Sequence, residues 1–155
     1  GDYYYQGKVL DMVKRNMGHV AARIEYNDAL SRKLYAGADV FLMPSEYEPC
    51  GIGQMIAMRY GAVPIVHKTG GLADTVIDYN QDKEHGTGFS FEDYTYKDLL
   101  YAFARAMIVY QTKSCKTTDD WKRLVFNGMS QDFSWRRSVQ EYVKIYKTAK
   151  LIRMH

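Results

Sequence analysis

The chain has 155 residues, of which 46% are hydrophobic and 25% are charged, and its net charge at pH 7 is +3. This size and composition fit one ordinary globular domain with a sizeable core, and they disfavour a second independent domain. The C-terminal stretch is basic but holds no dense run of Lys and Arg, so nucleic-acid binding is not expected. No apolar run approaches the ~20 residues of a membrane span. We therefore expect a soluble protein with no membrane partner and no visible export signal.

The two cysteines, Cys50 and Cys115, are not spaced as CxxC and have no His at metal-like intervals. Neither a zinc site nor a disulfide framework is indicated, and a reducing compartment is the default expectation.

The first third of the chain alternates between two kinds of hydrophobic pattern. Apolar residues at helical spacing predict a helix over residues 9–18, and alternating apolar residues predict a strand over 20–26. A short helix is predicted over 28–37, where a glycine ends the pattern. Residues 38–43 form a nearly continuous apolar run, which suits a strand covered on both faces in a parallel sheet.

The middle of the chain predicts one βαβ unit. After a loop from Pro44 to Cys50, apolar residues keep helical spacing from Ile52 to Tyr60. Val63–Val66 is another short apolar run. A strand, a loop, a helix and a strand in this order are typical of a parallel sheet.

The remainder is predicted to complete this sheet and then to become helical. Gly70 and Gly71 are expected to open a loop, residues 78–85 are polar and expected to be exposed, and residues 89–91 predict a short edge strand. Three further apolar stripes after Tyr96 predict three helices. The fold class is therefore α/β, a Rossmann-like doubly wound parallel sheet in one domain, with the sheet core over about 1–95 and helices over about 96–155.

The loop between the strand at 38–43 and the next helix is the most informative segment for function. Open α/β sheets bind ligands beyond the carboxyl ends of their strands. The free N–H groups and the macrodipole of a helix that begins near Gly51 favour an anion such as phosphate. Gly51 and Gly53 leave room for a close approach, although a tight turn explains them equally well. Glu48 could accept a hydrogen bond from a sugar hydroxyl or stabilise positive charge on the sugar. It could also serve only to stabilise the N-terminal end of the helix.

Three further features have an ordinary and a functional interpretation. Cys50 could contact a ligand, but a lone cysteine is more often a small buried filler. Gly70 and Gly71 follow the next strand and should approach the same sheet edge as Glu48, although a flexible turn would also explain them. Tyr26 could stack on a flat base, but it is one of 14 tyrosines.

Linked motifs surround this loop from about residue 20 to about residue 147. They are Glu48-Pro49-Cys50-Gly51-Ile52 with Gln54, Arg59-Tyr60-Gly61, Pro64, Lys68–Val76, Tyr35–Asp39, Gly86–Phe89 and Asp132–Trp135. In this order they resemble the C-terminal, nucleotide-sugar-binding domain of bacterial glycogen synthases and plant starch synthases.

The resemblance implies a GT-B glycosyltransferase, in which two Rossmann-like domains face a cleft and the C-terminal one holds the donor. It implies retaining transfer of glucose from ADP-glucose, or less often UDP-glucose, to the non-reducing end of an α-1,4-glucan, with no metal or cofactor. Glu48 would contact the donor glucose. Cys50 and the N–H groups of Gly51 and Ile52 would hold the sugar and the distal phosphate, and Tyr26 would stack on the nucleobase.

The chain also departs from this family pattern. Glu46 stands where many relatives carry an uncharged or basic residue, and Ile52 stands where leucine is common. The Arg and Lys pair that neutralises the diphosphate, and the acceptor domain that holds the glucan, would lie upstream of residue 1. We therefore expect a fragment that is inactive alone, from a bacterial cytoplasm by default or from a plastid if it is a starch synthase.

Two alternative functions remain open on the sequence. One is another retaining transferase of the same architecture, similar to sucrose synthase or phosphorylase. The other is a non-catalytic module that binds a nucleotide or a glucan.

Overall fold

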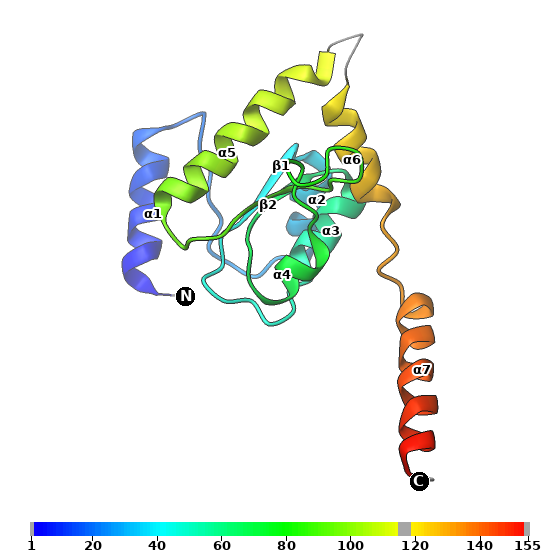
Figure 1. Cartoon of the computed structure of the whole chain (residues 1–155). Coiled ribbons are helices and arrows are strands. Elements are labelled where there is room, and N and C mark those ends of the chain that lie inside the picture. The colour runs from blue at the N-terminus through cyan, green and yellow to red at the C-terminus, as the bar shows by residue number, and fades with distance from the viewer. Residues whose placement is uncertain (1, 115–118, 154–155) are drawn as a thin grey trace. The chain divides into compact units, whose positions relative to one another are not determined.

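A computed structural model describes residues 2–114 and 119–153 of the chain (Figure 1). These residues belong to two compact units, residues 1–32 and residues 33–155. Cys115 lies outside the described residues. The assignment of residues 1–155 to a single domain remains a prediction.

The first unit contains helix α1 (Tyr3–Arg15), which confirms the helix predicted there. Its N-cap is Asp2, whose carboxylate accepts a hydrogen bond of 2.7 Å from the Tyr4 N–H. The chain leaves the helix through a turn at Gly18, which has a φ of 82°.

The strand predicted over residues 20–26 is wrong. These residues have no strand assignment. Alternating apolar side chains indicate a strand only where a neighbouring strand pairs with the backbone N–H and C=O groups, and the structure gives this segment no such ladder. Tyr26 consequently lies in irregular chain and is 96% exposed.

From residue 28 onward, helices alternate with the strands of one sheet, as predicted. The strands β1, β2 and β3 pair in that order and are all parallel, with Val40 opposite Val63 and Ile65 opposite Phe89. The elements are α2 (Asp28–Gly37), β1 (Val40–Met43), α3 (Gly53–Tyr60), β2 (Val63–His67), α4 (Gly70–Thr75), β3 (Phe89–Phe91), α5 (Tyr96–Tyr110), the 3-10 helix η1 (Gln111–Ser114), α6 (Asp120–Ser130) and α7 (Trp135–Arg153).

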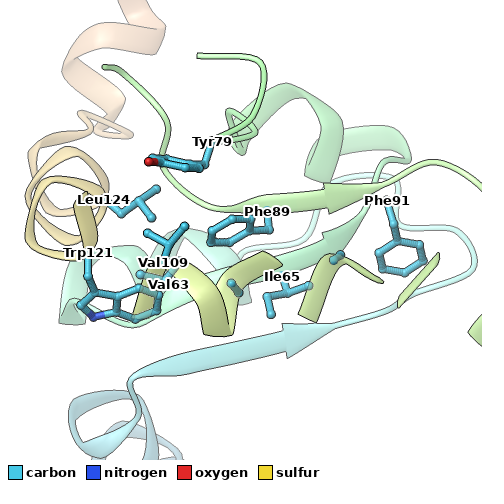
Figure 2. Packing of buried hydrophobic residues seen from close by; sticks show 10 residues of the cluster. Val63, Ile65, Tyr79, Phe89, Phe91, Val109, Trp121 and Leu124 are labelled. Carbon is cyan, nitrogen blue, oxygen red and sulfur yellow. The ribbon is translucent and has the colours of Figure 1, made fainter. Parts of the chain in front are cut away.

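The central strand β2 is buried on both faces. Val63 and Ile65 pack with Phe89 and with residues of α5 and α6 (Figure 2). Val66 points to the opposite face, into a second cluster with Met58, Leu72 and Val76. All five residues of β2 are buried. These two clusters explain why helices cover both faces of the sheet.

The earlier strand is less covered than its sequence predicts. Three residues of β1 are half-buried, and Leu42 is 48% exposed. In the described part of the chain β1 has only β2 as a neighbour. A continuous apolar run does not by itself tell a central strand from a strand with one neighbour.

Pro64 lies inside β2 although proline has no N–H to donate to a ladder. The next residue, Ile65, is the first of β2 to pair with β3, opposite Phe89. A Cβ on Gly88, just before β3, would lie 2.5 Å from the Pro64 oxygen and 2.8 Å from its Cγ. The missing side chain of Gly88 therefore makes room for the proline.

The expectation that residues 78–85 are exposed is wrong at its first two positions. Asp78 and Tyr79 are only 5% and 6% exposed. Arg105 of α5 pairs with Asp78 through Nη1–Oδ1 and Nη2–Oδ2 contacts of 3.0 and 3.2 Å, and the Ser90 N–H donates to Oδ2 at 2.6 Å. Burial acts to raise the pKa of Asp78, but the hydrogen bonds from Arg105 and Ser90 outweigh it and hold that pKa below its ordinary value.

The three helices predicted after Tyr96 are confirmed as α5, α6 and α7. Thr95 caps α5 by accepting a hydrogen bond from Asp98, and Asp119 caps α6 by accepting one from Lys122. No residue of α7 is buried. None of the described helices is long and apolar enough to cross a membrane.

Candidate functional site

Two loops meet at the carboxyl-terminal edge of the sheet. Residues 44–52 connect β1 to α3, and residues 68–69 connect β2 to α4, which begins at Gly70. Because β1 and β2 are parallel, both loops emerge at the same edge. The Gly71 N–H donates a hydrogen bond of 3.1 Å to the Glu48 carbonyl oxygen. The prediction that Gly70 and Gly71 approach the Glu48 loop is confirmed.

The glycine pair permits direct backbone contact between the two loops. A Cβ on Gly70 would overlap the Glu48 carbonyl group, and a Cβ on Gly71 would lie 2.7 Å from the Cys50 carbonyl carbon. The expectation that the pair opens a loop is wrong, because Gly70, with a φ of 42°, is already the first residue of α4. Only residues without side chains fit at this contact.

Gly51 makes room for the Glu48 side chain. Its φ is 63°, in the left-handed region that favours glycine. A Cβ on Gly51 would lie 2.9 Å from Glu48 Cγ and 3.0 Å from Gln54 Oε1. The Glu48 side chain is half-buried. It lies close to the Gly51 backbone, where the absence of a side chain leaves room for it.

Helix α3 begins without a side-chain cap. Its N-cap residue is Ile52, which is 62% exposed and makes no capping hydrogen bond. The first intrahelical bond runs from the Ile56 N–H to the Ile52 oxygen at 3.0 Å. N–H groups earlier in the helix have no intrahelical acceptor, and the macrodipole adds partial positive charge at this end. Such a helix end suits a phosphate group.

The remaining predicted site residues have different surroundings. Cys50 is a free and exposed thiol, which rules out the buried-filler interpretation. Gly53 begins α3, and a Cβ there would lie 3.4 Å from both Phe41 Cζ and Tyr35 Oη, an ordinary packing distance. Tyr26 belongs to residues 1–32, the other unit. The ligand roles of all these residues remain predictions.

Sequence reasoning assigned no role to Gln54 or Thr75, although both join the two loops. Gln54 is fully buried, and its Nε2 donates to the Gly51 oxygen and to Thr75 Oγ1, both at 3.0 Å. Thr75 Oγ1 in turn donates to the Gly71 oxygen at 2.6 Å. The available signal was a glutamine in the first turn of a helix whose next four residues, 55–58, are all apolar.

His67 provides a further link that the sequence did not predict. Its ring is buried at the end of β2, with Nδ1 2.8 Å from the Ser45 oxygen and Nε2 3.1 Å from the Glu92 oxygen. The imidazole thus connects the start of the Glu48 loop with the chain that leaves β3.

No cluster of three or more His, Cys, Asp or Glu side chains able to hold a metal ion occurs among the described residues. The groups that this edge presents include backbone amides, backbone carbonyls and the Glu48 carboxylate. Amides suit phosphate oxygens, and a carboxylate suits sugar hydroxyls.

Comparison with known proteins finds similar chains among glycogen synthases. The chain is 83% identical to a glycogen synthase of Hydrogenobaculum sp. (strain Y04AAS1) over its full length, which is 32% of that protein. It is 48% identical to glycogen synthase 1 of Synechocystis sp. over 95% of the chain and 30% of that protein. The chain thus spans about a third of the length of these relatives.

Among solved structures, the catalytic domain of starch synthase IV from Arabidopsis thaliana, bound to ADP and acarbose, matches with a TM-score of 0.79. That match has 39% identity and covers 94% of this chain and 29% of the other. Residues 16–120 match the family described as glycosyl transferases group 1. With this match over more than half its length, and with a parallel sheet whose edge presents an uncapped helix N-terminus beside a carboxylate, the chain belongs to the glycosyl transferases of group 1.

Proposed function

We propose that this chain is the donor-binding part of an enzyme that transfers glucose, with retention, from ADP-glucose to the non-reducing end of an α-1,4-glucan. The observation that carries the proposal is the meeting of Glu48, the N-terminus of α3 and the Gly70–Gly71 pair at one sheet edge. Support also comes from the glycogen synthases that it resembles and from the starch synthase structure that holds ADP and acarbose.

The N-terminus of α3 would bind the distal phosphate of the donor. When the bond from glucose to this phosphate breaks, negative charge grows on the leaving oxygen. Amides of Gly51, Ile52 and Gly53 that are fixed before the reaction stabilise this charge without having to reorganise. The hydrogen bonds from Gly71 to Glu48 and from Gln54 to Thr75 help to hold this geometry in place.

Glu48 would act on the sugar. Its side chain lies against Gly51, beside the proposed phosphate site. A carboxylate there accepts hydrogen bonds from glucose hydroxyls and stabilises the positive charge that develops on the sugar as the phosphate leaves. Cys50, which is exposed in the same loop, would contact the sugar phosphate. Tyr26, whose ring is exposed, would stack on the nucleobase.

The glucan acceptor would bind outside these 155 residues. The Arg and Lys side chains that neutralise the diphosphate would also lie outside them. The proposal includes no metal or cofactor, and its compartment is the bacterial cytoplasm, which the bacterial sources of the similar glycogen synthases support. UDP-glucose is the alternative donor.

A chimera tests the transfer reaction. The 155 residues replace the aligned segment of the Hydrogenobaculum glycogen synthase, to which they are 83% identical. We expect glucose incorporation into glycogen, with a higher kcat/KM for ADP-glucose than for UDP-glucose. A folded chimera with no transferase activity would contradict the proposal, and a preference for UDP-glucose would correct the donor.

Within this chimera, Glu48→Gln tests the role of the carboxylate. The substitution keeps the shape of a half-buried side chain and removes its charge. We expect kcat to fall at least about a hundredfold, as for loss of one electrostatic contact to a transition state, while the melting temperature stays within a few degrees. Glu46→Gln, at an exposed position in the same loop, is the matched control. An unchanged kcat in Glu48→Gln would contradict the proposed role of the Glu48 carboxylate.

Nuclear magnetic resonance on the chain itself tests binding separately from catalysis. Addition of ADP and then ADP-glucose should shift the amide signals of Gly51–Gln54 and of Tyr26, while the amide signals of α6 stay in place. Shifts confined to α6, or the same small shifts in every element, would contradict a donor site at the N-terminus of α3.

A further inference from the structure

Gln54 is a polar side chain in a place where an apolar one would be expected. It lies in the first turn of α3 and has no exposed surface. Its Nε2 reaches two acceptors in different elements, the Gly51 oxygen in the loop before α3 and Thr75 Oγ1 at the end of α4. The hydroxyl of Thr75 passes the connection on to the Gly71 oxygen.

These contacts close a ring of hydrogen bonds around the sheet edge. On one side, Gln54 and Thr75 link the Gly51 carbonyl to the Gly71 carbonyl. On the other side, the Gly71 N–H donates to the Glu48 oxygen. The Gly71 N–H is therefore bonded directly to the Glu48 loop. The Gly71 carbonyl oxygen is linked to that loop through Thr75 and Gln54.

The remaining polar atom of Gln54 has no partner in the described residues. Oε1 is buried and accepts no hydrogen bond. An unpaired buried acceptor lowers stability, and an apolar side chain of similar volume would avoid that loss. Packing alone therefore does not explain a glutamine at this position.

The place of Oε1 suggests what it does. Oε1 and Glu48 Cδ lie 3.0 and 3.3 Å from the same point, the position of a Cβ on Gly51. The partial negative charge of Oε1 repels a carboxylate oxygen that comes close to it, so Oε1 limits the side-chain conformations open to Glu48 beside Gly51.

From these contacts we propose that Gln54 is a positioning residue for the transfer reaction. Its amide group fixes the Gly51 peptide that leads into α3, and its oxygen limits the positions open to the Glu48 carboxylate. Thr75 is its partner in this role. The inference rests on the proposed function, because the groups that Gln54 positions are those assigned to the donor phosphate and sugar.

A double-mutant cycle in the chimera tests the link. Gln54→Met keeps the volume and removes the amide group, and Thr75→Val removes the hydroxyl. Thr75→Ser is the matched control because it keeps the hydroxyl. Each variant is compared with the unsubstituted chimera in kcat, in KM for ADP-glucose and for glycogen, and in melting temperature.

We expect Gln54→Met to lower kcat at least tenfold while KM for glycogen and the melting temperature stay unchanged. Thr75→Val should lower kcat several-fold, and Thr75→Ser should stay within twofold of the unsubstituted chimera. Because both residues act through one chain of bonds, the double variant should be no slower than the slower single variant. Losses that multiply, or a Gln54→Met kcat within twofold, would overturn the inference.

Hydrogen exchange on the chain gives a readout that does not need activity. In Gln54→Met, the Gly71 N–H should exchange at least tenfold faster, because its bond to Glu48 loses the support of the ring. Amides of β2 should exchange at their original rates. An unchanged exchange rate at the Gly71 N–H would overturn the inference whether or not the chimera is active. Inactivity of the unsubstituted chimera would contradict only the proposed function.

Discussion

The sheet edge uses glycine for different reasons at two places, the start of α4 (Gly70 and Gly71) and the turn before α3 (Gly51). At Gly70 and Gly71, the backbone of one loop touches the backbone of the other, and no side chain fits between them. At Gly51, the neighbour is the flexible Glu48 side chain, and the special feature is a φ of 63°. The glycines at the start of α4 therefore hold the two loops together, whereas Gly51 sets the conformation of a single side chain and the peptide beside it.

Gly71→Ala should have the largest effect, because its added Cβ would meet the Cys50 carbonyl group, which cannot move without moving the loop. We expect a loss of about 3 kcal/mol or more in unfolding free energy, the scale of strongly disruptive substitutions. Transferase activity in the chimera should be lost as well. Urea denaturation and initial rates measure the two effects.

The control for Gly71→Ala is Gly7→Ala in α1, where an added Cβ would have nothing within 4 Å. Alanine in a helix interior is favoured over glycine by up to about 1 kcal/mol, so this variant should be as stable as the parent or more so. Equal stability of the Gly71 and Gly7 variants would contradict the close contact between the loops.

Gly51→Ala should separate activity from stability. Holding an alanine at this φ costs about 1–2 kcal/mol, and the added Cβ displaces the Glu48 side chain from its position 2.9 Å away. We expect kcat to fall by at least about tenfold, equivalent to about 1.4 kcal/mol of lost transition-state stabilisation, while the protein stays folded. Gly53→Ala is the matched control, since its Cβ would lie at ordinary packing distance. If both variants lost activity equally, the distinction between the two places would fail.

The pH dependence of stability should show a smaller effect that does not involve these glycines. The pKa of Asp78 is lower in the folded protein than in the unfolded chain, because hydrogen bonds from Arg105 and Ser90 outweigh the effect of burial. Its contribution to stability is therefore fully present above about pH 4 and is lost as the pH falls through the folded-state pKa. One such proton changes the unfolding free energy by at most about 1.4 kcal/mol per pH unit.

Asp78→Asn isolates this contribution, since the pKa values of Asp82, Asp119 and Asp132 are lowered too and affect both proteins equally. Denaturation curves between pH 2 and pH 7 should show that the variant has a lower free energy of unfolding at pH 7. Its free energy of unfolding should also fall less steeply as the pH is lowered. Parallel pH profiles for the two proteins would show that Asp78 does not change its proton binding on unfolding.

The sequence predicts elements well where a local pattern is reinforced by packing. The helix from residue 53 to 60 and the strand β2 appear where periodicity predicts them, since both contribute side chains to the clusters on the two faces of the sheet. The meeting of the Glu48 loop with Gly70 and Gly71 was also predictable, because parallel strands bring their carboxyl ends to one edge.

The failures occur where the deciding partner is distant in the sequence. Residues 20–26 alternate like a strand but have no ladder to join. The sequence around Asp78 is typical of a surface segment, but Arg105, 27 positions later, and Ser90, 12 positions later, donate hydrogen bonds that offset the free-energy cost of burying Asp78. Gln54 depends in the same way on Thr75, 21 positions later. Local periodicity carries no information about such pairs.

The contact between Pro64 and Gly88 fixes the register of β2 and β3. A slip of one residue would place a side chain of β3 against the proline ring, in a space that only glycine leaves open. Pairing of β2 with β3 therefore begins at Ile65 and Phe89. This register places His67, the last residue of β2, opposite Phe91. Substitutions in the loops that follow β1 and β2 should therefore leave the register of β2 and β3 unchanged, because Pro64 and Gly88 lie outside both loops.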